Sequence, residues 1–286
     1  EIPVSVLKMI TEVRKNDNFN SFSKPLIMGI LNITPDSFSD GGKNFEPDQA
    51  FRAAERMIIE GADILDIGGE STRPGAKEVS EEEELMRVEP VITKIKSQYP
   101  QCKISVDTRK STVARRVLEL GVNFINDVSA LTFDKTTREV LAKTNAQVCL
   151  MHGGLNPETM QKNTTYSDVL LDIYDYLKKR IDFAVAGGIK KDNILIDPGI
   201  GFGKTTVQNV LLIRKASLFH SLGCPILYGV SRKRFIGNLG QVPKPIDRFP
   251  GSMVAAIELV RQGVQVLRVH DVKQTKQALD VWDALV

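Results

Sequence analysis

The chain has 286 residues, of which 42% are hydrophobic and 26% charged, which is ordinary for a globular protein with a large core. Its formal net charge of +3 is too small to indicate a nucleic-acid-binding surface, because such surfaces carry clustered lysine and arginine. No apolar run approaches the roughly 20 residues that cross a bilayer, and no signal-peptide pattern is present. We therefore expect a cytoplasmic protein without a membrane or nucleic-acid partner.

The three cysteines are widely separated, and no two of them form a C-x-x-C pair. Cys149 lies inside an apolar run, and Cys102 and Cys224 lie where such runs begin. An odd number of separated thiols indicates neither a disulfide framework nor a zinc site. We expect free, partly buried thiols in a reducing compartment.

The first 24 residues precede the first run of strand length. Residues 2–14 have the apolar spacing of a helix, and residues 16–23 have the composition of a flexible segment. We expect residues 1–24 to be an N-terminal extension or linker and residues 25–286 to be one domain. Because residue 1 is Glu1 and not methionine, we also consider that the chain is part of a longer polypeptide.

From residue 26 onward, one pattern repeats: an amphipathic helix, a short break, an apolar run of strand length and a polar loop. The first run covers residues 26–31, and the last helix starts near residue 272. Asn145 and Tyr99 with Pro100 stand at two of the breaks. We expect Asn145 to take the left-handed conformation that closes a helix, as glycine readily does. Glycine stands at five breaks, as Gly61, Gly121, Gly188, Gly223 and Gly263.

Eight apolar runs, each followed by a helix, predict a single (β/α)8 TIM barrel with a short extra N-terminal segment. An open doubly wound sheet is the alternative. It usually has a G-x-G-x-x-G turn after its first strand, and none follows Leu31. We expect the longest helix over residues 166–186, and Ser80 with Glu83 has the spacing of a capping box.

Polar residues stand at the carboxyl end of every predicted strand, although a strand buried on both faces should be nearly all apolar. Active sites of parallel barrels form at this end. We interpret the full set as functional, whereas a single member such as Asp66 fits function and an ordinary wet strand end equally well. The set consists of Asn32, Asp66, Asp107, Asn126, His152, Asp197, Ser231 with Lys233, and Arg268 with His270.

Three members of this set are hydrogen-bond acceptors without a reactive hydroxyl or thiol beside them: Asp107, Asn126 and Asp197. Carboxylate and amide oxygens suit a flat heterocycle that presents amino and ring N–H donors. Met151 and Phe202 are candidates for the apolar walls of such a site, and core packing explains them equally well.

Lys233, Arg268 and His270 form a second, basic group that we place at the opposite pole of the site. Arginine offers a planar fork to phosphate oxygens, and phosphate sites are common at the loops after late barrel strands. Asn32 is a neutral oxygen ligand that suits Mg²⁺ held mainly by substrate phosphates. A Schiff-base role for Lys233 is disfavoured by its loop position beside two arginines, and a structural role is preferred for His152.

Two loops rich in glycine and proline follow the first two strands, at residues 34–42 and 71–76, and we expect mobile lids there. The glycine-rich segment 197–204 lacks the spacing of a P-loop. We interpret it as a tight strand-to-helix turn that presents Phe202. The sequence has neither an H-E-x-x-H nor a G-x-S-x-G motif.

Several motifs follow one another in a fixed order along the chain. They are MGILN (28–32) with the loop after it, DIGGESTRPG (66–75), SVDT (105–108), INDVS (125–129), DPGIGFGK (197–204), SRKR (231–234) and RVHDV (268–272). In this order they resemble the dihydropteroate synthase family, from about Pro25 to the end of the chain. No single short motif carries the resemblance.

The resemblance implies a reaction of folate biosynthesis, in which a dihydropterin bearing a methyl diphosphate condenses with 4-aminobenzoate to give 7,8-dihydropteroate and diphosphate. It implies that Asp107, Asn126 and Asp197 hold the amino-pyrimidine edge of the pterin and that Lys233 holds its carbonyl side. It also implies that Arg268 packs on the pterin ring. The residues implied at the diphosphate and Mg²⁺ are Arg268, His270, Asn32 and Thr72. Those implied around 4-aminobenzoate, where sulfonamides compete, are Ser231, Phe202, Thr72 and Pro74.

The implied mechanism is dissociative: diphosphate leaves first, conjugation with the dihydropterin stabilises the cationic methylene, and the aniline nitrogen then attacks. We predict catalytic roles for Lys233, Arg268 and His270, and for Asp36 and Arg73, whose loops close over the diphosphate and the cation. Such a reaction requires stabilisation of an anion and positioning, and no protein nucleophile.

Two features depart from the family pattern. Gly153 follows His152 where the family usually has methionine, so we expect a looser loop there. The first 24 residues exceed the usual start, which suggests a fused, or a separate partner, pyrophosphokinase that makes the substrate. A homodimer is the family expectation.

Two rival functions share part of the pattern. A methyltetrahydrofolate-binding methyltransferase barrel shares the pterin-binding acceptors but does not need the diphosphate-binding residues. An inactive paralogue is the other rival, and the intact Asn32, Lys233, Arg268 and His270 argue against it.

Overall fold

The structure, a computed structural model, describes residues 24–33, 47–71, 78–153 and 164–285. Its centre is one sheet of eight strands in the order β6-β5-β4-β3-β2-β1-β8-β7, in which every neighbouring pair is parallel. The strands are apolar along most of their length, as expected for strands buried on both faces. They are β1 (Leu26–Asn32), β2 (Ile64–Gly68), β3 (Lys103–Asp107), β4 (Phe124–Asp127), β5 (Gln147–Met151), β6 (Ile194–Asp197), β7 (Leu227–Tyr228) and β8 (Val266–Val269).

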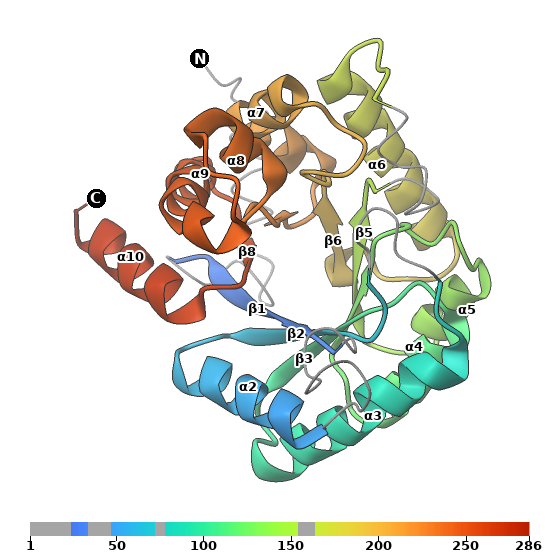
Figure 1. Ribbon diagram of the computed structural model, residues 1–286. Coiled ribbons are helices and arrows are strands. Elements are labelled where there is room, and N and C mark those ends of the chain that lie inside the picture. Colours follow the sequence, from blue (N-terminus) through green and yellow to red (C-terminus); the bar gives the residue numbers. More distant parts are fainter. Residues whose placement is uncertain (1–23, 34–46, 72–77, 154–163, 286) are drawn as a thin grey trace.

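The two ends of this sheet, β6 and β7, meet and close the barrel. Ile196 and Ile226 form a single parallel bridge there, and the Ile196 amide donates to the Pro225 carbonyl at 3.0 Å. Helices surround the strands (Figure 1). The prediction of a single (β/α)8 barrel is therefore confirmed, and the open doubly wound alternative is wrong.

The helices follow the predicted strand–helix alternation, with additions after the last strands. A 3-10 helix follows α7, and two helices with a 3-10 turn between them follow β7. The α-helices are α2 (Pro47–Ile59), α3 (Glu81–Gln98), α4 (Ser111–Glu119), α5 (Thr136–Ala142), α6 (Val169–Ala186), α7 (Thr206–Arg214), α8 (Arg234–Gly240), α9 (Phe249–Arg261) and α10 (Val272–Leu285); the 3-10 helices are η2 (Lys191–Asn193), η3 (Ala216–Leu222) and η4 (Pro245–Arg248).

The glycines that precede the strands behave as predicted. All five have a left-handed φ, between 72° and 97°, which a residue with a Cβ rarely adopts. Asn145 does not have a positive φ, so that expectation is wrong. The chain turns there through Thr144 instead, whose hydroxyl accepts from the Ala146 amide at 3.2 Å.

Two predicted helix starts differ from those in the structure, because side chains form other hydrogen bonds there. Ser80 caps α3 by accepting from the Glu83 amide at 3.2 Å, but the Glu83 carboxylate pairs with Arg87, so only half of the predicted capping box is seen. A complete box opens α7 instead. The long helix starts at Val169, because the Asp168 side chain caps it.

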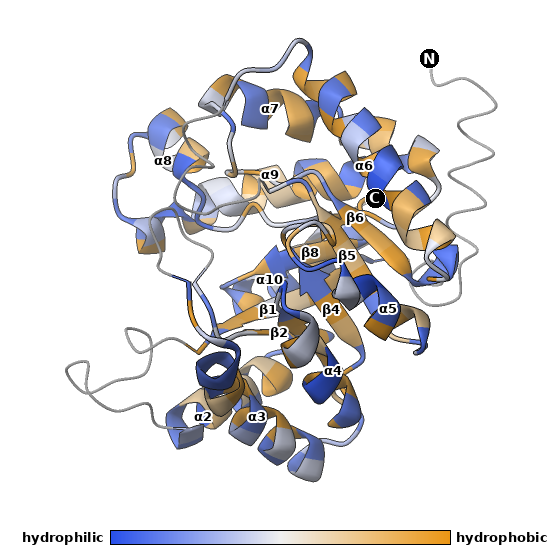
Figure 2. Ribbon diagram, turned by 90° about the vertical axis from the view of Figure 1, so that its right-hand side faces the viewer, coloured by the Kyte–Doolittle hydropathy of each residue, from blue (hydrophilic) through white to orange (hydrophobic). Residues whose placement is uncertain are grey.

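Apolar side chains fill the space between the barrel and the helices. They also fill the barrel interior toward the amino-terminal ends of the strands. In Figure 2 the strands are mostly orange, and the helices carry both orange and blue positions. Because side chains alternate along a strand, every second residue points into the barrel. The apolar interior cluster consists of Leu26, Met28, Ile64, Phe124, Cys149, Leu195, Leu227 and Val266.

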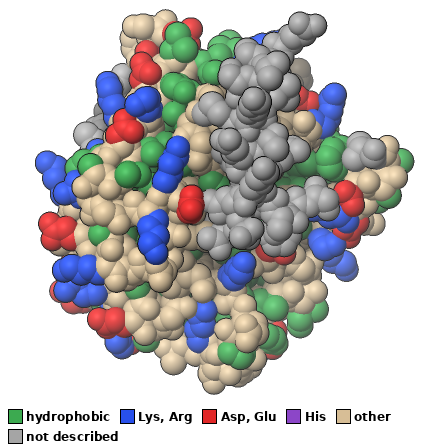
Figure 3. Space-filling model, turned by 180° about the vertical axis from the view of Figure 1, so that it is seen from behind, with side chains coloured by type: hydrophobic (Ala, Val, Ile, Leu, Met, Phe, Trp, Pro, Cys, Tyr) green, Lys and Arg blue, Asp and Glu red, His purple; other side chains and the backbone are tan. Residues whose placement is uncertain are grey.

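The surface carries mixed charge. On the face shown in Figure 3, basic and acidic side chains are interspersed among other residues. Several form helical pairs, such as Lys178 with Asp182 at 2.9 Å. Among the described residues, every helix is too short or too polar to cross a membrane.

Candidate active site

Polar side chains replace apolar ones inside the barrel toward the carboxyl ends of the strands. In the strand register, Asp66 lies beside Ser105, and Asp107 lies beside Asn126. All four are buried. Arg268 enters the same cluster from β8, one strand beyond β1. The period of two along each strand thus converts scattered polar residues into one contiguous site.

Asp66 is the centre of this cluster and has no solvent exposure. Its Oδ1 accepts from the Ser105 hydroxyl at 2.6 Å. Its Oδ2 accepts from Arg268 Nε at 2.6 Å and from Asn126 Nδ2 at 3.2 Å. The sequence left the role of Asp66 open, because a single polar strand end is uninformative. The signal that identifies it is its inward position, two residues after the interior Ile64.

Arg268 joins the acceptors to the basic group. Its Nη2 donates to Asp107 Oδ2 at 3.3 Å, in addition to the bond to Asp66. Burial disfavours the guanidinium charge, but the two carboxylates outweigh burial and raise the pKa of Arg268. Burial raises the pKa of Asp107 to about 8, against the opposing effect of Arg268. The prediction that Arg268 lies apart from the acceptors is therefore wrong, since Arg268 bonds to two of the buried carboxylates.

Asp197 and the turn after it form the next part of the site. Asp197 Oδ1 accepts from the Gly199 amide at 2.7 Å, and burial raises the pKa of Asp197. The turn is tight, as predicted, with left-handed φ at Gly199 and Gly201. It places the Phe202 ring 4.2 Å from Lys233 Nζ. An ammonium over an aromatic face is an attractive arrangement.

Lys233 and its neighbours, which follow β7, lie beside the turn that carries Phe202. Burial, reinforced by Arg268, lowers the pKa of Lys233 to about 8. Arg232 has a left-handed φ of 58°, unusual for a residue with a long side chain. Its Nε donates to Asp271 Oδ2 at 3.0 Å, and its amide donates to Ser252 Oγ at 2.9 Å. Arg232, which the sequence did not single out, therefore fixes the backbone between Ser231 and Lys233.

His270 lies beside Ser231, with Nδ1 3.0 Å from the Ser231 hydroxyl. The His270 amide also donates to this hydroxyl, at 3.2 Å. Burial, together with Arg268 and Arg232, lowers the pKa of His270 to about 3. The lowered pKa favours the neutral imidazole in the free protein at neutral pH.

Asn32 and Met151 lie at the edge of this cluster. Met151 is buried and pairs in register with Asp197, a position that fits a pocket wall and core packing alike. Asn32 is partly exposed and pairs with Gly68, which places no side chain over the amide. Within the described ranges, no three His, Cys, Asp or Glu side chains group as metal ligands. The predicted site residues Asp36, Thr72, Arg73 and Pro74 lie outside the described residues.

His152 is held by packing rather than poised for chemistry. Its ring meets Tyr176 edge-on at 4.8 Å, and its amide donates to the Asp197 carbonyl at 2.9 Å. Burial, with a contribution from Lys204, lowers the pKa of His152 to about 3. These contacts support the structural interpretation of His152.

Gly153 is closely packed. A Cβ at this position would lie 2.6 Å from the Val128 carbonyl oxygen and 2.6 Å from the Met151 methyl group. Real Cβ atoms are not found this close to backbone oxygen. Gly153 is therefore a position that a residue with a Cβ does not fit, and the rest of the loop for which we expected a looser chain, from residue 154, lies outside the described residues.

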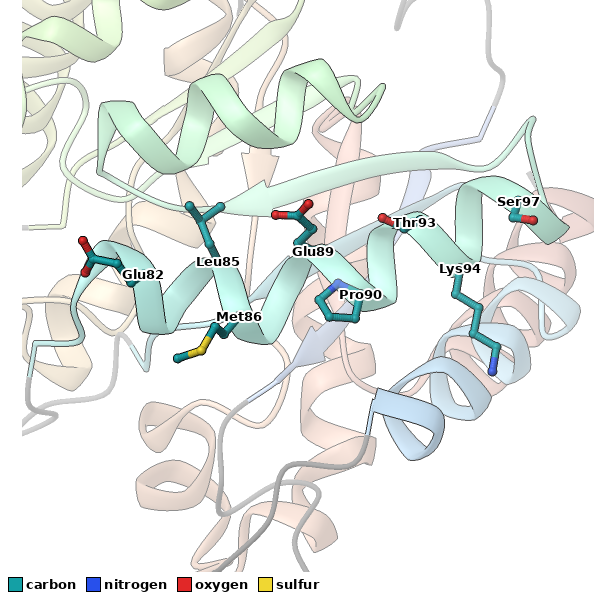
Figure 4. A pocket seen from close by; sticks show the side chains of 8 residues that line it. All are labelled: Glu82, Leu85, Met86, Glu89, Pro90, Thr93, Lys94 and Ser97. Atoms are coloured by element: carbon teal, nitrogen blue, oxygen red, sulfur yellow. The ribbon is translucent and has the colours of Figure 1, made fainter.

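A separate hollow lies on the surface of α3, and all of its lining residues belong to this helix (Figure 4). It is away from the strand ends and contains none of the predicted site residues. It is lined by Glu82, Leu85, Met86, Glu89, Pro90, Thr93, Lys94 and Ser97.

The barrel and its buried acceptors define a class of protein, the pterin-binding enzymes. A family model described as "Pterin binding enzyme" matches residues 28–270, which include every strand end described above. More specifically, the chain belongs to the dihydropteroate synthase family, and it is a transferase of folate biosynthesis.

Relatives and solved structures support this assignment. The chain is 45% identical over 270 residues to the dihydropteroate synthase of Haemophilus influenzae, covering 94% of this chain and 97% of the relative. It is similar to a Xanthomonas albilineans dihydropteroate synthase with 4-aminobenzoic acid, with TM-score 0.86, 44% identity and coverage of 92% and 93%. It is also similar to a Yersinia pestis dihydropteroate synthase with a sulfonamide drug complex, with TM-score 0.86, 45% identity and coverage of 92% and 94%.

Proposed function

We propose that the chain condenses (7,8-dihydropterin-6-yl)methyl diphosphate with 4-aminobenzoate, giving 7,8-dihydropteroate and diphosphate. The observation that carries the proposal is the set of buried acceptors inside the barrel. Asp107, Asn126 and Asp197 are each at most 6% exposed, and each offers further oxygen lone pairs beyond its bond to Arg268, Asp66 or Gly199. A flat heterocycle with amino and ring N–H donors provides such partners.

The orientation of Asn126 supports a donor-rich ligand. Because Asn126 Nδ2 donates to Asp66, the amide oxygen is left to face the other way. Asp197 has one oxygen engaged by the Gly199 amide, which leaves the second free to accept from the pterin. Lys233, which lies beside the turn after Asp197, is proposed to donate to the pterin carbonyl. Arg268 packs on the pterin ring.

The diphosphate is proposed to lie at the mouth of the barrel, beside Asn32, Arg268 and His270. His270, neutral in the free protein, contributes a hydrogen-bond donor or gains a proton when the anion binds. Asn32 fits a Mg²⁺ ion held mainly by phosphate oxygens and water, because magnesium sites of this kind need few protein ligands. Such an ion, when bound beside Asn32, would supply positive charge to the diphosphate.

The aminobenzoate is proposed to bind against Phe202 and Ser231, with Thr72 and Pro74 completing the pocket. Ser231 is buried and its hydroxyl is held by His270, so its position is fixed. Sulfonamides resemble 4-aminobenzoate and are proposed to compete at this pocket.

The chemistry proceeds by breaking the bond between the methylene carbon and the diphosphate oxygen, with the electron pair leaving on the diphosphate. The aniline nitrogen then forms the new C–N bond and loses a proton. No described side chain is needed as a nucleophile. Positioning and charge stabilisation carry the catalysis, with Asp36 and Arg73 proposed to act through their loops.

A coupled assay of diphosphate release tests the proposal. We expect release with the dihydropterin diphosphate, 4-aminobenzoate and Mg²⁺ together, and loss of product when 4-aminobenzoate is omitted. A methyltransferase barrel would bind methyltetrahydrofolate and release no diphosphate, and an inactive paralogue would bind pterin without turnover. Absence of product at saturating substrates would contradict the proposal.

The pterin pocket has its own test. Asp197→Ala removes one of the buried acceptors, so we expect the Kd for pterin, measured by calorimetry, to rise by roughly tenfold or more. Asp192→Ala, in the 3-10 helix η2 that precedes the same strand, is the matched control. Unchanged pterin affinity in the Asp197 variant would show that the pocket is placed wrongly.

We also propose a homodimer. Exposed apolar side chains on two neighbouring helices support it: Val207 on α7 is 77% exposed and Leu239 on α8 is 62% exposed. A hydrogen bond of 2.9 Å between Asn238 and Thr206 joins these helices. Light scattering is expected to give twice the chain mass. The Val207→Glu/Leu239→Glu variant is expected to shift this mass toward the monomer, and a monomeric wild type would contradict the proposal.

A reducing, cytoplasmic setting is proposed for the protein. Cys102, Cys149 and Cys224 are all free thiols. Burial raises the pKa of Cys224 to about 12 and raises that of Cys149 as well, which keeps both thiols unreactive. The linker role of residues 1–24 and a fused or partner pyrophosphokinase stay predictions, since residues 1–23 lie outside the described residues.

A further inference from the structure

Lys204 is a buried lysine that the proposed reaction does not use. It is the last residue of the turn that follows β6, and it is 5% exposed. A buried lysine is costly unless its ammonium finds partners, so its contacts indicate what holds it there.

The ammonium of Lys204 is surrounded by backbone oxygens. Nζ donates to the Gly199 and Phe202 carbonyls, both at 2.8 Å, and to the His152 carbonyl at 3.2 Å. These three carbonyls match the three hydrogens of an ammonium, and we call them the Lys204 cage. His152 Nδ1 lies 3.0 Å away as a further acceptor. Burial lowers the pKa of Lys204 to about 7, and Asp197 opposes this shift.

The backbone is bent to make this cage. Gly199, Gly201 and Gly203 all have a left-handed φ, and their alternation with other residues curls the turn. A Cβ at Gly199 would lie 2.0 Å from the His152 carbonyl oxygen. The turn therefore presses against the end of β5 while its carbonyls point at Lys204.

The outer side of the same turn faces the site. A Cβ at Gly201 would lie 3.0 Å from Lys233 Cδ, so the Lys233 side chain packs directly on the turn. Lys233 Nζ lies over the Phe202 ring. Lys204 thus binds the inside of the turn through the Phe202 carbonyl, while the Phe202 side chain forms a wall of the site.

Asp197 and Phe202 are held differently. Asp197 is a strand residue, in register with Met151, and its carbonyl accepts from the His152 amide. Phe202 has no strand partner and depends on the turn. Without the ammonium, Asp197 keeps its strand pairing, and only its side-chain bond to the Gly199 amide involves the turn, whereas Phe202 has no strand pairing to hold it.

We propose that Lys204 is a positioning residue for 4-aminobenzoate: its ammonium fixes the turn that presents Phe202. This inference rests on the proposed function, because it takes Phe202 as a wall of the aminobenzoate pocket. Lys204 touches no substrate and acts through Phe202.

Lys204→Met tests the proposal, since methionine keeps most of the length and removes the three donors. With both substrates varied, KM for 4-aminobenzoate is expected to rise about tenfold, the effect of losing one charged hydrogen bond. KM for the pterin diphosphate is expected to change less than about twofold. The exposed Lys190, at the other end of β6, gives the matched control Lys190→Met, in which both values stay unchanged.

A double-mutant cycle with Phe202→Ala separates positioning from a general structural defect. If Lys204 acts through Phe202, Lys204→Met adds little to the KM for 4-aminobenzoate once the ring is gone. Equal rises in the two KM values, or fully additive effects in the double variant, would overturn the proposal.

Two further measurements keep the result interpretable. If Lys204→Met does not fold, as judged by circular dichroism, Lys204→Gln retains two N–H donors and is expected to shift the same KM by a smaller factor. An unchanged KM for 4-aminobenzoate in Lys204→Gln would then overturn the proposal. A wild type that forms no dihydropteroate would instead contradict the proposed function.

Discussion

At the scale of single residues, Asp66 determines how two other residues face the barrel interior. It fixes the amide of Asn126 by accepting from its nitrogen, and it fixes the guanidinium of Arg268 by accepting from Nε. A neutral residue at this position would leave the Arg268 charge paired only with Asp107. Buried charges that lose a partner are strongly destabilised, so the arrangement is sensitive to a single change.

Asp66→Asn is expected to lower kcat/KM for the pterin diphosphate about 10- to 100-fold, because charged hydrogen bonds contribute about 1.5–3 kcal/mol each. Steady-state kinetics at fixed 4-aminobenzoate measures this change. Asp63→Asn is the control, since Asp63 Oδ2 accepts from the Ile27 amide at the opposite end of the barrel. A similar loss of activity in both variants would show that Asp66 acts only through stability.

At the scale of elements, an ion-pair cluster ties together the segments before and after residues 72–77. Lys110 Nζ donates to Glu70 Oε2 at 2.5 Å before this segment and to the Val79 carbonyl at 2.7 Å after it. It also binds Glu84 Oε2 at 2.7 Å on α3. Arg109 adds a bond to Glu70 at 3.0 Å. The start of α4 therefore anchors the connection between β2 and α3.

Lys110→Met would leave Glu70 and Glu84 buried without their ammonium partner. We expect the free energy of unfolding in urea to fall by about 3–5 kcal/mol, the cost of breaking a buried pair by removing one partner. The exposed pair between Lys178 and Asp182 provides the comparison: Lys178→Met should change the free energy of unfolding far less, because solvent screens exposed pairs. Comparable losses in the two variants would contradict a buried network.

The elements also show how far the sequence predicts this fold. The glycines before the strands predicted the helix–strand alternation of the barrel. A left-handed residue that closes a helix is a local requirement, and glycine is the residue type that meets it most readily. The prediction of a left-handed Asn145 was wrong. The Thr144 hydroxyl forms a different turn there, and the local sequence pattern does not show which of the two turns is more stable. The turn presenting Phe202 was predicted from its glycines, but the ammonium of Lys204 inside it was not.

The sequence predicted which residues form the candidate site but not which of their side chains contact one another. Strand ends identify Asp107, Asn126 and Asp197 from the chain alone. Which side chains meet depends on register and alternation across strands, and so the contact of Arg268 with Asp107 and the central place of Asp66 required the structure. The neutral state of His270 depends on burial, which sequence does not give.

At the scale of the whole molecule, buried histidines make stability depend on pH. Burial lowers the pKa of both His152 and His270 from 6.5 to about 3. The unfolded chain therefore binds more protons than the folded one between these values, so this contribution is present above pH 6.5 and is lost as the pH falls toward 3. Asp107, whose pKa is raised to about 8, acts in the opposite sense.

His152→Gln isolates one of these contributions. Below pH 6.5, the free energy of unfolding of the wild type should fall faster than that of the variant, by at most about 1.4 kcal/mol per pH unit, the value for one proton. Urea titrations between pH 7.5 and 5 measure the two slopes, and the groups common to both proteins cancel in their difference. Parallel slopes would mean that the pKa of His152 is the same in the folded and the unfolded chain.

The closure of the barrel between β6 and β7 has a consequence for ligand binding. A single bridge, between Ile196 and Ile226, is the strand pairing at this junction, whereas most neighbouring strands share three or more residue pairs. Asp197 ends the strand on one side, and Lys233 follows the strand on the other. A ligand that contacts both residues would connect β6 and β7 across this sparsely paired junction. Its binding free energy would then oppose local separation of the two strands, so ligand occupancy and the stability of the barrel would be thermodynamically linked.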